Sequence, residues 1–216
     1  MTPLLRQIFL VVTPLSLAVV LWWHPPGGDE IYADVHEDVR AWMFVHTVFL
    51  FFTPLIAGCV YLLLDSVKSH AATVSRVSLV FFLVFYTAYE VTIGVGTGIL
   101  VDYTNGLPAA EQAVVADAIQ DYNKSYLLGD PASASLLLGF FGWVVALTAA
   151  AVALRRAGAG WPATILVGFS ALFAIHPPPV GPAALVCLAV AAVLIERWRA
   201  SERRVAAIPS SVPVTA

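Results

Sequence analysis

The sequence predicts an all-α integral membrane protein with six transmembrane helices and a short amphipathic helix in the second outer loop. Three observations predict this class. The 216 residues are 60% hydrophobic and 12% charged, whereas a soluble domain usually carries about 25% charged residues. Six apolar runs each approach the ~20 residues that cross a bilayer as a helix. The basic residues concentrate in alternate loops. One polytopic membrane domain over residues 1–204 accounts for all three observations.

The apolar runs place the six spans in order along the chain. They cover residues 7–23, 41–64, 77–101, 134–154, 159–176 and 180–197. The first run is not interpreted as a signal peptide, because it ends in Trp22-Trp23-His24-Pro25 and lacks the small residues of a cleavage site. The last two runs are short, and a re-entrant pair is the alternative for them. Residues 205–216 are predicted to form a disordered tail.

The distribution of Lys and Arg predicts the orientation, since these residues concentrate in cytoplasmic loops. Nine of the eleven basic residues fall on one side of the predicted membrane. They are Arg6, Lys68, Arg76, Arg155, Arg156, Arg197, Arg199, Arg203 and Arg204. Only Arg40 and Lys124 fall on the other side. The prediction is a multi-pass protein of a cell membrane with both termini in the cytoplasm, and the excess of Arg over Lys is typical of a GC-rich bacterial genome.

Acidic residues collect in the two long outer loops. These loops hold ten of the fourteen: Asp29, Glu30, Asp34, Glu37, Asp38, Asp102, Glu111, Asp117, Asp121 and Asp130. The simpler interpretation is a solvated acidic face, and the alternative is a vestibule that attracts cations. Residues 31–40 predict a short helix before the second span. In the second loop Pro108 predicts a helix start, and Leu107, Val114 and Tyr122 recur at helical spacing. That helix is expected to lie on the membrane surface or to pack against the first outer loop.

Glu90 is the one acidic residue inside an apolar run, in the span 77–101. A carboxylate in the bilayer is costly, so it is expected to face the bundle in its neutral form, where it either pins the packing of the helices or marks a functional site. Counting helical rise from the outer ends places Thr13, Thr53 and Trp143 at a similar depth. These four residues form a candidate proton, cation or ligand site. Gly94 and Gly98 form a G-x-x-x-G pattern that lets another helix approach closely.

Four of the five histidines lie near the outer face, and three of them, His24, His46 and His176, are candidate metal ligands or residues at the mouth of a cavity. A His at a helix end before proline is more often a boundary residue than a ligand. A zinc-protease motif is absent, since Arg40 stands where a helix that starts with His36 would need its second His. A haem is disfavoured, since no other span interior offers a second axial His. The sequence therefore leaves the cofactor unknown.

Three function classes follow from these observations. The leading hypothesis is a small transport-like or ligand-binding membrane protein with an outward-facing cavity that leads to Glu90. The first alternative is a non-catalytic accessory or scaffold protein, and the second is an outer-face histidine metalloprotein. No catalytic motif supports an enzyme. The bilayer is the predicted partner, a small ligand or cation and an oligomeric or membrane-protein partner are open, and nucleic acid is disfavoured because the basic cluster lacks aromatic residues.

Overall fold

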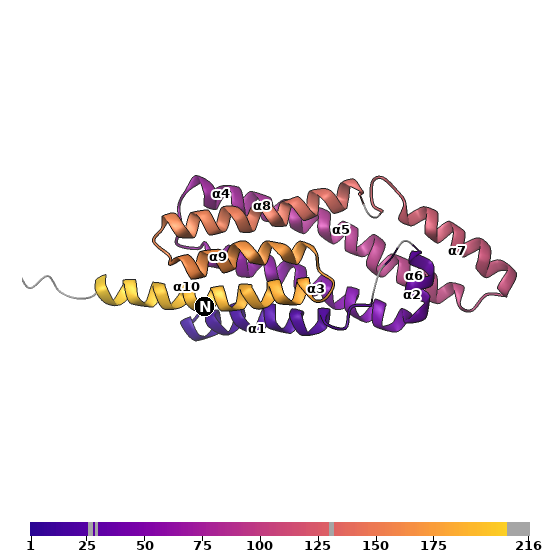
Figure 1. The fold of residues 1–216 in the computed structure, drawn as a ribbon, viewed down its shortest axis with the longest axis horizontal. Helices are drawn as coiled ribbons and strands as arrows, with labels where there is room; N and C mark the ends of the chain where they lie inside the picture. The colour runs from indigo at the N-terminus through magenta and orange to yellow at the C-terminus, as the bar shows by residue number, and fades with distance from the viewer. Residues whose placement is uncertain (26–27, 29, 130–131, 207–216) are drawn as a thin grey trace, which may run out of the picture.

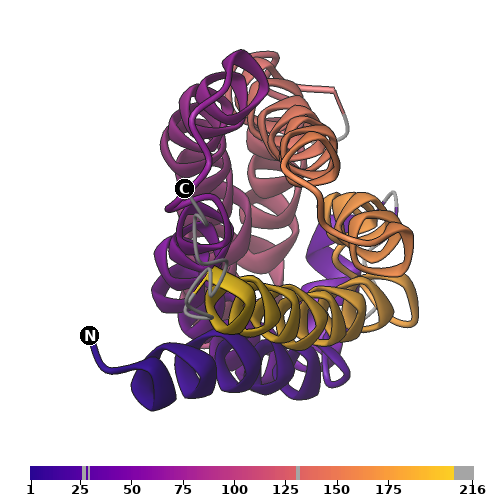
Figure 2. The same ribbon diagram turned by 90° about the vertical axis from the view of Figure 1, so that its left-hand side faces the viewer.

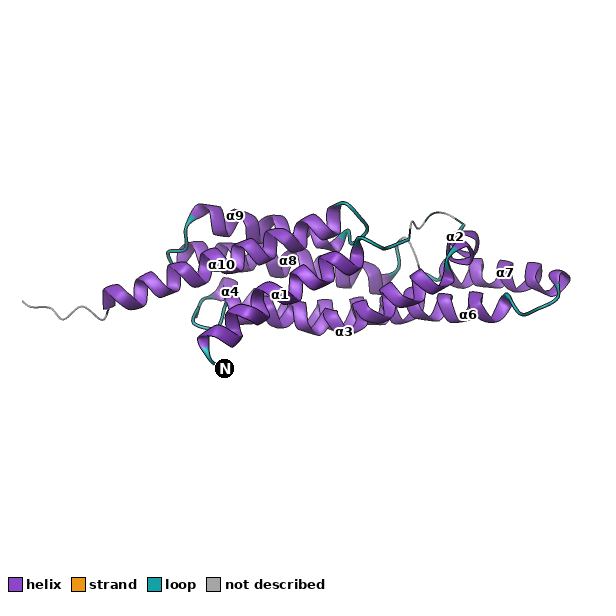
Figure 3. Cartoon of the chain, turned by 90° about the horizontal axis from the view of Figure 1, so that it is seen from below, coloured by secondary structure: helices purple, strands orange, loops and turns teal. Residues whose placement is uncertain are grey.

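The protein consists of helices packed along one long axis (Figure 1). The computed structural model describes residues 1–25, 28, 30–129 and 132–206, and these ranges contain no strand. The helices are α1 (Pro3–Leu21), α2 (Ile31–Glu37), α3 (Val39–Leu63), α4 (His70–Phe81), η1 (Phe82–Tyr86), α5 (Thr87–Tyr89), η2 (Glu90–Gly96), α6 (Thr97–Thr104), α7 (Ala109–Asn123), α8 (Ala134–Arg156), α9 (Trp161–Phe169), η3 (Ser170–Ala174) and α10 (Val180–Ala206). Figure 3 shows the same helices from below.

Five helices are long and apolar enough to cross a membrane. They are Pro3–Leu21, Val39–Leu63, His70–Thr104, Ala134–Arg156 and Val180–Val205. The third joins α4 to α6 without a break and has 35 residues. A further apolar segment, Trp161–Ala174, combines α9 and η3 and is shorter. The chain is therefore all-helical over the described residues and has five candidate spans, and each of the six predicted apolar runs overlaps one of these segments.

The two C-terminal segments differ in length from their apolar runs. The run 180–197 is short, but α10 continues to Ala206 because the polar residues that follow the run are good helix formers. The run 159–176 gives a helix that ends at Ala174, shortly before Pro177, Pro178 and Pro179, which cannot donate backbone hydrogen bonds. Residues beyond Ala206, where most of the predicted disordered tail falls, lie outside the described residues.

The helices pack in pairs around a common apolar core. α4 packs on α8, α1 packs on α10, and α9 with η3 packs between α8 and α10; Figure 2 shows this grouping along the long axis. The described ends of the chain lie together at one end of the bundle, here called the proximal end (Figure 1). α2, α6 and α7 lie at the opposite end, here called the distal end.

Three arginines satisfy the last carbonyl groups of α3 at the proximal end. The bonds run from Arg6 to Leu62 (2.6 Å), from Arg199 to Leu63 (2.5 Å) and from Arg76 to Leu64 (2.7 Å). Carbonyl groups in the last turn of a helix lack a partner within that helix. Arg6 and Arg199 also form ion pairs with Glu196, at 3.1 and 2.8 Å. These contacts connect the ends of α1, α4 and α10 to the end of α3.

The distal end has a small core of its own, formed by Val35, Trp42, Val101 and Ile119. α2 forms where the short helix before the second span was predicted, and α7 forms between the third and fourth candidate spans. α7 packs against α6 and α2. Packing against the loop before the second span was one of the two expectations for this helix. Its buried side chains are not those of the predicted apolar face, since Ile119 is buried and Val114 is 70% exposed.

The third candidate span contains two π-helical segments, η1 and η2. Such segments occur often at functional sites. η1 packs tightly on α8, because a Cβ at Gly139 would lie 2.7 Å from the backbone nitrogen of Tyr86. Tyr86 ends η1 and Glu90 begins η2. The irregular part of this span therefore carries the two polar side chains that reach the site described next.

Candidate metal centre

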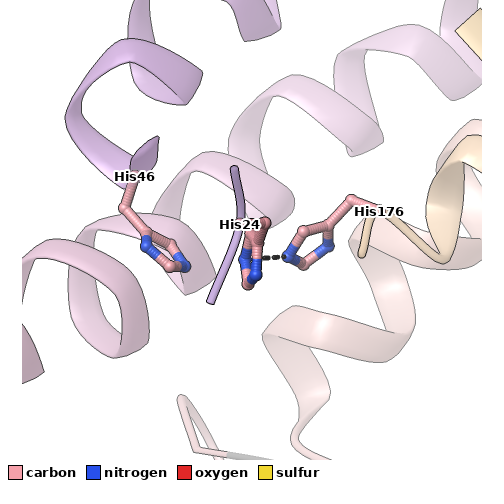
Figure 4. Close-up of side chains that lie close together, drawn as sticks. All are labelled: His24, His46 and His176. Carbon is pink, nitrogen blue, oxygen red and sulfur yellow. Dashed lines mark hydrogen bonds between the residues drawn. The ribbon is translucent and has the colours of Figure 1, made fainter. Parts of the chain in front are cut away.

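Three histidines from separate parts of the chain converge at the distal side of the main bundle (Figure 4). His24 follows the end of α1, His46 lies within α3, and His176 follows η3. One ring nitrogen from each can be chosen so that all three lie within 4.8 Å of one another. Nε2 of His24 and Nε2 of His176 are 3.2 Å apart. Ligand atoms of a tetrahedral zinc ion with bonds of about 2.0–2.1 Å are separated by roughly 3.3–3.4 Å, so this pair already has the spacing of two metal ligands.

Hydrogen bonds to the backbone fix which nitrogen of two rings faces the cluster. Nδ1 of His24 lies 2.6 Å from the carbonyl oxygen of Pro25, and Nδ1 of His46 lies 2.8 Å from that of Trp42. A carbonyl group only accepts, so each Nδ1 carries the proton and each Nε2 keeps its lone pair. Metal-binding histidines characteristically donate their other ring N–H to a carbonyl or carboxylate group in this way.

The third ring is oriented by a side chain. Nδ1 of His176 lies 2.8 Å from the hydroxyl oxygen of Tyr86. In the metal-free arrangement Tyr86 donates to Nδ1, and the Nε2–H of His176 donates to the free Nε2 of His24. If the proton moves from Nε2 to Nδ1, the bond to Tyr86 reverses and Nε2 of His176 becomes a ligand. Tyr86 accommodates both tautomers.

Glu90 lies beside the histidine cluster. Its Oε2 is 4.0 Å from Nε2 of His46, and its Oε1 is buried without a hydrogen-bond partner among the described residues. A buried carboxylate oxygen without a partner is costly and requires an explanation, such as a water molecule or an ion. A cavity of about 320 Å³ adjoins the group and is lined by the three histidines, Glu90, Trp42 and Tyr89, among others.

Trp42 and Gly94 position His46. The Trp42 ring stacks on the imidazole, with centroids 4.2 Å apart, and its Nε1–H donates to the carbonyl oxygen of Gly94 at 2.7 Å. A Cβ at Gly94 would lie 2.7 Å from Cγ of His46 and closer still to Cδ2. Only glycine therefore leaves room for this ring, and the expectation of a close helix approach at Gly94 and Gly98 is confirmed.

Burial favours the neutral form of His24 and His176, which both follow the end of a helix. Desolvation lowers the pKa of His24 below 6.5, and its bond to Pro25 opposes this only in part. Desolvation also lowers the pKa of His176 well below 6.5, and positive charge on His24 or His46 would lower it further. Both rings are therefore neutral at pH 7, which is the state that binds a metal ion.

The four residues of the predicted intramembrane layer are not brought together as one group. Glu90 lies beside His46, where α1 and η3 end. The Thr53 hydroxyl donates to the carbonyl oxygen of Phe49, and the Trp143 indole donates to that of Ser170. Thr13 is buried in α1, which packs on α10 and α3. The third candidate span begins at His70 and extends to Thr104, beyond both ends of its apolar run, so its ends differ from those used to count helical rise.

One residue of the site was missed at the sequence level. Tyr86 is a common residue type for a span, and nothing in its spacing relates it to His176, which follows another helix. Trp42 precedes His46 by four residues in α3, so the sequence already placed these two on one helix face. The one available indication for Tyr86 was its position four residues before Glu90, on the same helix face. Comparison of the chain with protein-family models, curated proteins and solved structures finds no match.

Proposed function

We propose that this protein is an integral membrane metalloprotein that binds one divalent transition-metal ion through His24, His46 and His176. The observation that carries the proposal is the convergence of three imidazole groups from three chain segments, each with its other nitrogen held by a hydrogen bond. Imidazole groups select zinc, copper, iron and nickel over magnesium or calcium. A carboxylate beside three imidazoles favours zinc or iron among these.

Six crossings, with both termini on the cytoplasmic side, are part of this proposal. Both described ends of the chain lie at the proximal end, together with the basic residues that cap α3. An odd number of crossings would separate them. The short segment of α9 and η3 supports the sixth crossing, since Trp161, Ile165, Phe169 and Leu172 form an exposed apolar stripe along it. A stripe of this kind suits contact with lipid.

The proposed site lies at the outer boundary of the bilayer. The helix from His70 to Glu90 is roughly 30 Å long at α-helical rise, which is about the thickness of the hydrocarbon core. Glu90 is then close to the headgroup level, and α2, α6 and α7 extend beyond it. A polar cluster at this level avoids most of the cost of burying charge at the bilayer centre.

The hypothesis of transport to Glu90 and the scaffold hypothesis are less well supported. The cavity beside Glu90 fits the first, but Phe49, Phe82, Trp143 and Phe173 are fully buried and pack beneath the site in mutual ring contacts. A water-filled path would have to displace them. The scaffold hypothesis fits this packed interior but gives no reason for three neutral imidazole groups to meet.

Metal analysis of the purified protein tests the proposal. The full-length protein in detergent is stripped with a chelator, loaded with zinc, iron(II) or cobalt(II), and freed of excess metal by gel filtration. We expect one ion per chain in the wild type, and a loss of binding in His24→Ala, His46→Ala and His176→Ala. His36→Ala and His70→Ala are matched controls, because both histidines are exposed and lie outside the cluster. A wild type that retains no stoichiometric metal contradicts the proposal.

A further inference from the structure

We infer that the metal centre keeps one coordination position open toward the cavity, where it takes a water molecule or a small anion, and that Glu90 faces this position without binding the metal. The inference rests on the proposed metal site and defines its ligand. Structural zinc sites are closed by four protein ligands, whereas sites that bind an exchangeable ligand have three protein ligands and a free position.

The first observation is the number of protein groups within reach of one ion. Ligand atoms of the three imidazole groups lie within 4.8 Å of one another, and this group does not include Glu90. The nearer oxygen of Glu90 is 4.0 Å from Nε2 of His46, so the carboxylate group lies beside the cluster without being part of it.

The second observation is the unpartnered oxygen of Glu90. Oε1 is buried without a hydrogen-bond partner among the described residues, and the whole residue is 1% exposed. A water molecule on the metal ion is a strong donor that would satisfy this carboxylate group. Glu90 would then orient the bound ligand, in the role that carboxylate groups near metal-bound water commonly have.

The third observation is the space beside the histidines. A cavity of about 320 Å³ is lined by His24, His46, His176 and Glu90 together. A closed site of four protein ligands would need no such volume, because the side chains would surround the ion. The wall of this cavity includes Trp42, Tyr89 and Ile93. The free coordination position therefore opens on a pocket with aromatic and apolar side chains beside the histidines. The pocket is large enough for a small molecule placed on the ion.

Cobalt(II) makes the open position measurable, since its visible spectrum reports the ligands around it. The full-length protein is loaded with one cobalt ion and titrated with sodium azide while bound metal is quantified. We expect a saturable change in the spectrum of the wild type without loss of cobalt. Glu90→Gln should retain cobalt and bind azide at least as tightly, because a negative charge beside the anion is removed. Glu111→Gln, an exposed acid of α7, is the matched control.

Each other outcome has a distinct meaning. A wild type that binds cobalt but shows no response to azide has a closed site, and the inference is then wrong. Loss of cobalt from Glu90→Gln, with the fold intact by circular dichroism, shows that Glu90 is a ligand and also overturns it. Failure of the wild type to bind cobalt, zinc or iron counts against the proposed function itself. Glu90→Ala is the second variant. If Glu90 is not a ligand, removal of its carboxylate group should leave cobalt bound.

Discussion

The hydroxyl oxygen of Tyr86 and Nδ1 of His176 are 2.8 Å apart. This bond joins the irregular part of the third candidate span to the segment that follows η3, and it holds the His176 ring by the nitrogen that faces away from the cluster. Loss of this hydrogen bond should therefore lower the affinity of the proposed site for a metal ion.

Tyr86→Phe tests this contact. The substitution keeps the aromatic ring against Phe82 and Phe49 and removes the hydroxyl group. We expect the affinity for zinc to fall by about 10–100-fold, the usual effect of losing a group that orients a metal ligand, with little change in helix content. Competition with a fluorescent chelator measures the affinity. Tyr103→Phe is the control, since Tyr103 is 68% exposed, and an equal effect of both substitutions would refute a specific role for Tyr86.

Gly94→Ala tests the positioning of His46. An alanine Cβ would overlap the imidazole ring of His46, so the ring must leave its place on Trp42. Overpacking of a buried position also costs about 1–3 kcal/mol of stability, so helix content by circular dichroism is measured beside the affinity. We predict at least a tenfold loss of metal affinity, measured by the same competition. Gly168→Ala meets nothing within 4 Å and should bind as the wild type does; unchanged binding in both variants would contradict the prediction.

The metal-free protein should lose stability as the pH falls. Burial lowers the pKa of His24 and His176 below 6.5 in the folded state, whereas the unfolded chain takes up protons near that value. Below about pH 6.5 the unfolded state binds more protons, so acid favours unfolding. Above that pH both rings are neutral in both states and the contribution is constant. Thermal unfolding in detergent between pH 8 and 5.5 measures this dependence. The double variant His24→Asn, His176→Asn should show a flatter dependence, and an unchanged slope would exclude these residues as the cause.

Topology is tested by reporters that depend on the compartment. A reporter that functions only in the cytoplasm should be active when fused after Arg204 and inactive when inserted at Gly106, in the turn before α7. A reporter that needs the outer compartment should give the opposite pattern. If the position after Arg204 lies outside and Gly106 inside, the orientation is inverted, and if both lie on one side, six crossings are excluded.

The fold and the site differed in how far they could be predicted from the sequence. Continuous apolar runs indicate helices that can cross a bilayer, so each run coincides with an apolar helical segment, although the third begins at His70 and α10 continues to Ala206. Pro108 marked the start of the loop helix. Depth was harder to predict, because the third candidate span runs from His70 to Thr104 and so begins seven residues before its apolar run 77–101. Helix rise gives depth only when the helix ends are known.

The histidine cluster shows the same limit. His24, His46 and His176 were recognised as candidates from their shared location near the outer face, but their mutual distances depend on how α1, α3 and η3 pack. That packing is set by glycines and aromatic rings whose partners lie far away in the sequence, such as Gly94 against His46 and Gly139 against Tyr86. Periodicity along one helix contains no information about such pairs.

The three imidazole groups also differ in when the ribosome produces them. His24 follows the first candidate span and His46 lies in the second, whereas His176 follows η3, and its place depends on the contacts of η3 with α8 and α10. A nascent chain that has inserted only its first half presents two imidazole groups and an unpaired Glu90. In the proposed metal site, high-affinity capture of an ion would therefore follow the packing of η3 against α8 and α10. In the proposed orientation the ion then arrives from the outer compartment, so the metal supply on that side, and not the cytoplasmic pool, determines which ion the mature protein contains.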